Sequence, residues 1–127
     1  MALDKGLIGG STVFMILSLL KEKDYYGYEI IKEIEKRSNS VFQFKEGTLY
    51  PVLHRMENQD FVKSYRCETE NGKVRKYYRI TFEGKKQLEK EKKHWSEFTS
   101  SVNSVVGGGG HAFTLVGKIR KRYIVSC

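Results

Sequence analysis

The sequence predicts a mainly α protein of the α+β class, a winged helix-turn-helix with a two-stranded wing and a long C-terminal helix. Three observations predict this fold. Apolar residues recur at helical spacing in three segments before residue 60. Two segments rich in Tyr, Val, Ile and Thr then flank Asn71-Gly72, and a last helical pattern covers 82–106. An isolated hairpin is marginally stable in water, so we expect it to pack on the helices.

The first two helices are expected at 10–22 and 26–37. The first segment is apolar on one broad side and is too short to span a bilayer, so it predicts a buried helix and no membrane partner. The second segment places Ile30, Ile31 and Ile34 on one face and charged residues on the other. Together they predict the scaffold on which a third helix rests.

The third helix is expected at 48–59, with Thr48 as its N-cap and Pro51 in its first turn, where a missing N–H removes no hydrogen bond. Apolar residues at i, i+3, i+4 and i+7 form its core stripe: Leu49, Val52, Leu53 and Met56. The remaining residues face solvent: Thr48, Tyr50, Pro51, His54, Arg55 and Asn58. Arg55 and His54 can donate to guanine edges or phosphates, and Tyr50 can reach a phosphate or a thymine methyl group. The alternative is an ordinary amphipathic helix with a polar outer face.

A basic hairpin follows this helix. Residues 61–81 hold six basic and two acidic side chains, a net charge of +4. Asn-Gly favours a two-residue type I′ turn, which would pair Glu70 with Lys73 and Tyr65 with Tyr78. The cations near the tip would then reach a groove or its backbone: Lys73, Arg75 and Lys76. Alternatively, these charges only protect a sheet edge against aggregation.

The long helix at 82–106 is expected to begin after an N-cap at Thr81. Its apolar residues step by 7, 3, 4 and 3, as in a coiled coil, and predict a dimer interface: Leu88, Trp95, Phe98, Val102 and Val105. Trp95 and Phe98 either pack only in that interface or also stack on a flat aromatic ligand in a cleft of the dimer.

Three regions follow: a winged-helix domain at 1–81, a dimerisation helix at 82–106, and a glycine-rich basic tail at 107–127 that we expect to be mobile. The formal charge of +8 favours a polyanionic partner, although a solvated surface explains it equally. Two cysteines in 127 residues are far from a disulfide scaffold and fit a cytoplasmic protein. The three histidines lie in different elements, so we expect no catalytic residue, metal site or cofactor.

The segments "YGYEIIKEIE", "FKEGTLYPVLHRME" and "RKYYRIT" resemble the PadR family of bacterial transcriptional regulators, in particular its small subclass with a single C-terminal helix. The resemblance implies a winged-helix homodimer that binds operator DNA, usually as a repressor, and in many members releases it on binding a phenolic compound or an aromatic drug. By position it implies DNA-side roles for Tyr28 of the second helix, for the start of the third helix and for the wing. It also implies that Trp95 lies where some members stack planar ligands. Asp60 stands where the family usually has Gly.

The leading hypothesis is therefore a sequence-specific DNA-binding regulator, a ligand-responsive repressor that acts as a homodimer on an inverted repeat of double-stranded DNA. The alternative is a protein that binds aromatic small molecules through Trp95 and has no operator. A third hypothesis is a helical adaptor whose long helix pairs with another protein. The basic hairpin argues against the last two.

Overall fold

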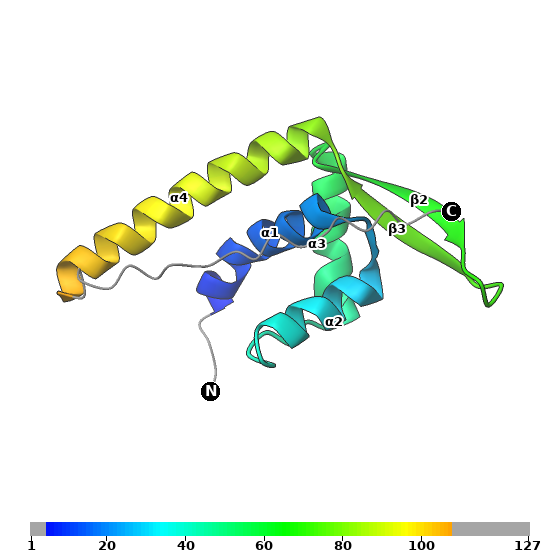
Figure 1. Cartoon of the computed structure of the whole chain (residues 1–127), viewed down its shortest axis with the longest axis horizontal. Coiled ribbons are helices and arrows are strands. Elements are labelled where there is room, and N and C mark those ends of the chain that lie inside the picture. Colours follow the sequence, from blue (N-terminus) through cyan, green and yellow to red (C-terminus); the bar gives the residue numbers. More distant parts are fainter. Residues whose placement is uncertain (1–4, 108–127) are drawn as a thin grey trace.

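The computed structural model describes residues 5–107. Its elements are α1 (Lys5–Glu22), β1 (Tyr25–Tyr26), α2 (Gly27–Arg37), α3 (Glu46–Asn58), β2 (Val62–Glu68), β3 (Val74–Ile80) and α4 (Phe82–Val106). Helices α1 to α3 form a body from which the β2–β3 hairpin projects to one side and α4 to the other (Figure 1). This is the winged helix-turn-helix that the sequence predicts. The predicted tail lies, from residue 108 onward, outside the described residues.

The core lies where α1, α2, α3 and the sheet meet. Its fully buried large side chains are Ile16, Leu17, Leu20, Ile30, Leu49, Leu53, Met56, Val62 and Leu88. Leu88 is the contribution of α4, which reaches the core only with its N-terminal half. Apolar burial of this kind is the main favourable term in folding, and here it fixes α3 against the other two helices.

The first two helices differ from the prediction at their N-termini. Helix α1 begins at Lys5 instead of residue 10. Helix α2 begins at Gly27, because Tyr25 and Tyr26 form a short strand that pairs antiparallel with Tyr78 and Tyr77 of β3. The sheet therefore has three strands in the order β1-β3-β2. A two-residue strand is too short to show a period, so the sequence pattern could not indicate it.

The predicted N-cap of α3 is wrong. The N-cap is Lys45, and Thr48 is the third helical residue, whose N–H donates to the carbonyl of Lys45 at 3.0 Å. Pro51 is therefore the sixth residue of the helix and lies beyond the first turn. There its ring removes the bond that an N–H would make to the carbonyl of Gly47. The helix begins at Glu46, two residues before the predicted start, and the carboxylate of Glu46 suits the positive end of the helix dipole.

The hairpin is present, but its predicted register is wrong by one residue. Tyr65 pairs with Tyr77, and Glu68 pairs with Val74. The N–H of Gly72 donates to Thr69 at 2.9 Å, and Gly72 has a φ of +76°. These features describe a three-residue loop with a glycine bulge, not the two-residue type I′ turn. One extra loop residue moves every side chain of one strand to the other face.

The prediction for α4 is confirmed in its bounds and its cap. The hydroxyl of Thr81 accepts the N–H of Gly84 at 2.9 Å and itself donates to the carbonyl of Asp60 at 2.5 Å. Asp60 has a φ of +64°, the left-handed geometry that glycine adopts most easily. Gly84 packs so closely on Phe61 that no larger side chain fits between them. The start of α4 is thus fixed on the turn between α3 and β2.

Candidate nucleic-acid interface

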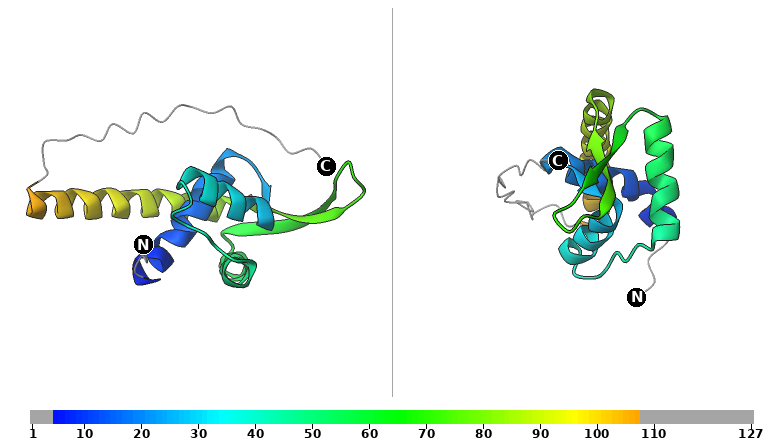
Figure 2. Two further views of the ribbon diagram at one scale, coloured as in Figure 1. Left: turned by 90° about the horizontal axis from the view of Figure 1, so that it is seen from below. Right: turned by 90° about the vertical axis from the view of Figure 1, so that its right-hand side faces the viewer.

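The outer face of α3 is open to solvent, as predicted. Thr48, Tyr50, Pro51, His54, Arg55 and Asn58 are all exposed. Leu49, Leu53 and Met56 on the opposite side are fully buried, and Val52 is partly buried against them. Figure 2 shows α3 as a straight helix along one side of the body, with the hairpin beside it. An exposed polar helix face next to a basic hairpin is the arrangement with which winged-helix proteins read duplex DNA.

A partly buried contact between Glu57 and Ser64 connects the C-terminal half of α3 to strand β2 of the wing. The carboxylate of Glu57 accepts the N–H of Ser64 at 3.1 Å and its hydroxyl at 2.6 Å. These hydrogen bonds, chiefly the one from the hydroxyl, hold the pKa of Glu57 below its usual value. Lys76 and His54 contribute in the same direction through their charge. Helix α3 and strand β2 are therefore linked by a charge-assisted contact as well as by packing.

The three predicted wing cations do not have equal environments. Lys73 and Lys76 are exposed, whereas Arg75 is partly buried. The Cζ atom of Arg75 lies 4.5 Å from the centroid of the Tyr26 ring, a cation–π contact. Lys76 places its Nζ atom 5.7 Å from the centroid of Tyr78. The wing thus offers two exposed lysines and one partly buried arginine that lies close against an aromatic ring.

Two tyrosines of the predicted site lie near the start of α2, Tyr28 on that helix and Tyr50 on α3. Tyr28 is 44% exposed, and the Nζ atom of Lys32 lies 5.3 Å from its ring centroid. Tyr50 reaches across from α3 to α2: a Cβ atom on Gly27 would lie 2.4 Å from its Cε1 atom. Gly27 therefore makes room for the Tyr50 ring, which is still 39% exposed. The structure thus brings Tyr50 of α3 against the start of α2.

A row of tyrosines supports that surface from the sheet. Tyr77 of β3 is stacked with Tyr65 at 5.7 Å between ring centroids, and Tyr26 meets it edge-on at 5.5 Å. The Tyr65 hydroxyl donates to Asp24 at 2.6 Å. Burial, and secondarily this bond, raise the pKa of Tyr65 to about 12. Arg79 also lies close to Asp24, with its Nε atom 3.4 Å from the carboxylate.

The predicted ligand and dimer residues lie on α4. Leu88 is buried in the core of one chain, so it is not free for a partner. The other four are exposed: Trp95 by 44%, Phe98 by 54%, Val102 by 42% and Val105 by 85%. Leu88, at the N-terminal end of the predicted interface, thus packs within its own chain, whereas the four apolar residues that follow it on α4 are exposed.

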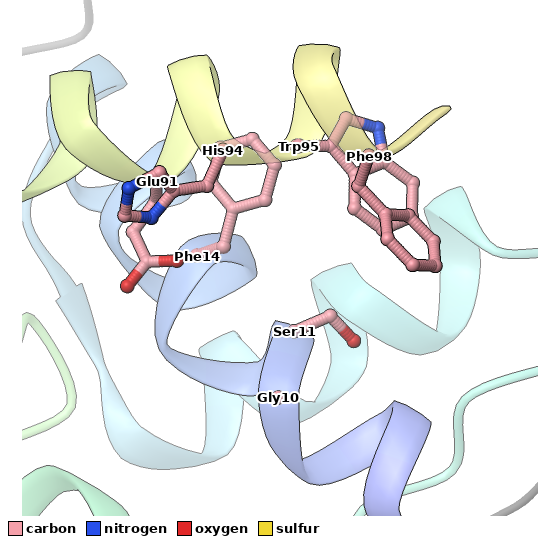
Figure 3. A pocket seen from close by; sticks show the side chains of 7 residues that line it. All are labelled: Gly10, Ser11, Phe14, Glu91, His94, Trp95 and Phe98. Atoms are coloured by element: carbon pink, nitrogen blue, oxygen red, sulfur yellow. The ribbon is translucent and has the colours of Figure 1, made fainter. Parts of the chain in front are cut away.

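A cavity of about 210 Å³ lies beside Trp95 (Figure 3). Its lining from α4 is Glu91, His94, Trp95 and Phe98, and its lining from α1 is Gly10, Ser11 and Phe14. The ring centroids of Trp95 and Phe98 are 6.1 Å apart, and those of Trp95 and Phe14 are 6.3 Å apart. Besides the predicted Trp95 and Phe98, the cavity is lined by residues that the sequence did not indicate, among them Phe14 of α1. The pattern of α1 could indicate that Phe14 packs inward, but not that it faces Trp95.

Within residues 5–107 no three His, Cys, Asp or Glu side chains are grouped so that they could hold a metal ion. In the same range no helix combines the length and apolarity needed to cross a membrane.

The fold and this surface define a winged-helix DNA-binding protein. Residues 16–90 match the profile of the transcriptional regulator PadR-like family. A transcriptional regulator of Clostridium thermocellum is similar, with 40% identity and a TM-score of 0.70 over 79% of this chain and 96% of that one. A PadR family transcription regulator of Clostridium difficile is 41% identical, with a TM-score of 0.67 over 76% and 99% of the two chains. An uncharacterized protein of Lysinibacillus sphaericus is 42% identical over 102 residues, which are 80% of this chain and 94% of that one.

The chain therefore belongs to the PadR-like family of transcriptional regulators. It is a DNA-binding regulator of transcription and not an enzyme. Within residues 5–107, one long helix, α4, follows the wing.

Proposed function

We propose that this regulator is a cytoplasmic homodimer that represses transcription by binding an inverted-repeat operator through α3 and the wing. The observation that carries the proposal is the uncovered apolar face of α4. Trp95, Phe98, Val102 and Val105 recur at coiled-coil spacing on this helix, and each is at least 42% exposed. A contiguous apolar face of this kind marks an interaction site. A second copy fits it, because a face with this repeat is self-complementary under two-fold symmetry.

Dimerisation through α4 would give the DNA surface its geometry. Helix α4 projects from the body on the side opposite to the hairpin (Figure 1), so two copies joined along it leave both α3 faces free. A dimer of this type reads two half-sites when its recognition helices are about 34 Å apart, one turn of the duplex. Arg55 and His54 would read base edges, while Thr48, Tyr50, Pro51, Tyr28 and the wing cations would contact the backbone.

The oligomeric state and operator binding can be tested with one pair of variants. Phe98→Glu places a charge on the exposed apolar face of α4, and Ser100→Glu places the same charge on an exposed residue off that face. We expect sedimentation to give twice the mass of one chain for the wild type and for S100E, and a single-chain mass for F98E. In gel shifts with the promoter of its own gene and a scrambled duplex, F98E should lose at least about a hundredfold in operator affinity. A wild-type protein that is monomeric at micromolar concentration contradicts the proposal.

We further propose that a flat aromatic or phenolic effector binds beside Trp95. The cavity of about 210 Å³ is smaller than typical ligand pockets of about 300–1,000 Å³, so one chain would supply part of a site that a second copy completes. Three aromatic rings, those of Phe14, Trp95 and Phe98, offer faces on which a planar ligand can stack. An effector of this kind acts only if it binds one dimer geometry more tightly than the other.

The effector can be followed directly because Trp95 is the only tryptophan of the chain. Titration with 4-hydroxybenzoic acid and with a planar aromatic dye should quench its fluorescence and, at the same concentrations, release the operator. Quenching by a chain that never binds an operator would favour the alternative function, a protein that binds aromatic compounds. An absence of quenching by either compound would contradict an aromatic effector of these kinds and leave DNA binding intact.

A further inference from the structure

Arg75 is held more closely than the two exposed lysines near the tip of the wing, Lys73 and Lys76. Its guanidinium lies over the Tyr26 ring at 4.5 Å, and its side chain is partly buried. In the part of the chain that the structure describes, none of the ion pairs involves Arg75. Arg79 on the same strand also lies over a ring, that of Tyr65 at 5.1 Å, but it is paired with Asp24. Arg75 is therefore oriented by the protein without being neutralised by it.

The ring that holds Arg75 is itself fixed. Tyr26 pairs with Tyr77 in the sheet and meets that ring edge-on at 5.5 Å. The N–H of Tyr26 donates to the carboxylate of Glu29 at 3.1 Å, which ties it to the first turn of α2. The orientation of Arg75 is thus set by β1, β3 and α2 together.

Tyr50 brings this arginine close to α3. Its ring lies against Gly27, the residue that follows Tyr26. Burial raises the pKa of the Tyr50 hydroxyl, the Glu46 charge adds to the rise, and the positive charge of Arg75 opposes it. The same charge opposes the rise in the pKa of Tyr77. Arg75 therefore lies at the junction of α2, α3 and the wing.

We propose that Tyr26 is a positioning residue that seats Arg75 for one backbone phosphate of the DNA beside α3. This inference rests on the proposed docking of α3 and the wing on a duplex. An aromatic ring occupies the flat face of a guanidinium and leaves its five donors at the edge free for a bidentate contact with phosphate oxygens. Cation–π contact leaves the charge in place. Because the side chain is ordered in advance, less rotamer freedom is lost on binding than for Lys73 or Lys76.

A double-mutant cycle on a mixed-sequence 30-bp duplex tests the seat, because a phosphate contact does not depend on the operator. Arg75→Ala should weaken binding about tenfold and lower the salt slope by about one unit. Tyr26→Leu should weaken it about three- to tenfold, and Tyr26→Phe, which keeps the ring, should bind like the wild type. The double variant Y26L/R75A should bind no more weakly than R75A alone.

Tyr65 and Arg79 provide the matched control, since they form the same kind of pair on the same sheet. Tyr65→Leu and Arg79→Ala should change duplex affinity less than twofold. If Y26L fails to melt cooperatively, Arg75→Lys replaces it. Lysine keeps the charge but loses the planar fork, so it should bind about threefold more weakly or worse.

If the losses of duplex affinity in Y26L and R75A add up in the double variant, the proposed positioning of Arg75 by Tyr26 is wrong. It is also wrong if Y65L loses as much affinity as Y26L. Wild-type affinity in R75K would overturn it too. In each of these cases DNA binding by α3 would stand. A wild-type dimer that binds no duplex at low salt would instead overturn the proposed function on which the seat rests.

Discussion

Replacing Gly84 by Ala should destabilise the protein strongly, because the added methyl group pushes α4 away from Phe61 in the turn between α3 and β2. A Cβ atom at this position would lie 2.1 Å from the carbonyl oxygen of Phe61 and 2.8 Å from Cγ1 of Ile80. The Phe61 carbonyl must then move away by about 1 Å, because closely packed atoms leave no empty space for the new methyl group. That oxygen accepts the N–H of Thr81 at 3.0 Å, so the shift also weakens the bond at the N-cap of α4.

The magnitude follows from these two effects. Overpacking a well-filled site costs about 1–3 kcal/mol, and a lost backbone hydrogen bond costs about 1 kcal/mol more. We expect G84A to lose about 2–4 kcal/mol, which lowers the melting temperature by roughly 10–20 °C for a domain of this size. Circular dichroism at 222 nm follows the transition. Gly47→Ala is the matched control, because its Cβ atom would meet nothing within 4 Å.

Gly47 is exposed in the first turn of α3, so an alanine there should leave the melting temperature unchanged or raise it slightly. A G84A protein that melts within about 2 °C of the wild type would refute the close approach of α4 to Phe61. It would also refute the argument that the start of α4 is fixed on the turn between α3 and β2.

Three further predictions address other parts of the molecule. Asp60→Gly should raise the stability by up to about 1 kcal/mol and Asp60→Ala should lower it, because Asp60 has a φ of +64°, and thermal melting distinguishes the two. Glu57→Gln should destabilise the protein at neutral pH. Since the folded-state pKa of Glu57 lies below the usual value of a glutamate, about 4.3, the stability that it adds is present above that pH and is lost as the pH falls through the folded-state pKa. The difference in urea unfolding between E57Q and the wild type should therefore shrink below about pH 4.5; a constant difference would contradict this. Arg55→Ala should reduce the discrimination between operator and scrambled DNA, whereas Lys76→Ala should weaken both alike and flatten the salt slope by about one unit; equal slopes would place Lys76 away from the phosphates.

Much of this architecture could be predicted from periodicity, because long amphipathic elements carry their own signal. The bounds of α4 and its Thr81 cap, and the buried stripe of α3, follow from spacing and capping chemistry. The position of the hairpin could be predicted, but the pairing register of its strands could not. Asn71-Gly72 fits both a two-residue turn and a three-residue loop with a bulge at Gly72, and only the packed sheet decides between them.

The parts that could not be predicted depend on contacts between distant segments. Strand β1 has two residues and pairs with β3 about fifty residues later, so no local pattern indicates it. The same holds for the Tyr50 ring over Gly27 and for Arg75 over Tyr26. For the site, the exposure of the α3 face could be predicted, but the distinction between Arg75 and the two lysines could not. That distinction arises from β1.

Strand β3 joins the two halves of the proposed function. It carries Arg75 near one end and passes at the other end, through Thr81 alone, into α4. The first turn of α4 is fixed by the Thr81 cap and by Gly84 against Phe61, while the Trp95 side of the helix reaches out to Phe14 and beyond the core. A ligand that shifted α4 near Trp95 would therefore act on a helix whose N-terminal end is fixed to the turn between α3 and β2. Because Thr81 alone separates β3 from α4, we expect a tilt of α4 to change the angle of the wing or, in the proposed dimer, the distance between the two α3 helices. An effector would thus need no separate route to the DNA.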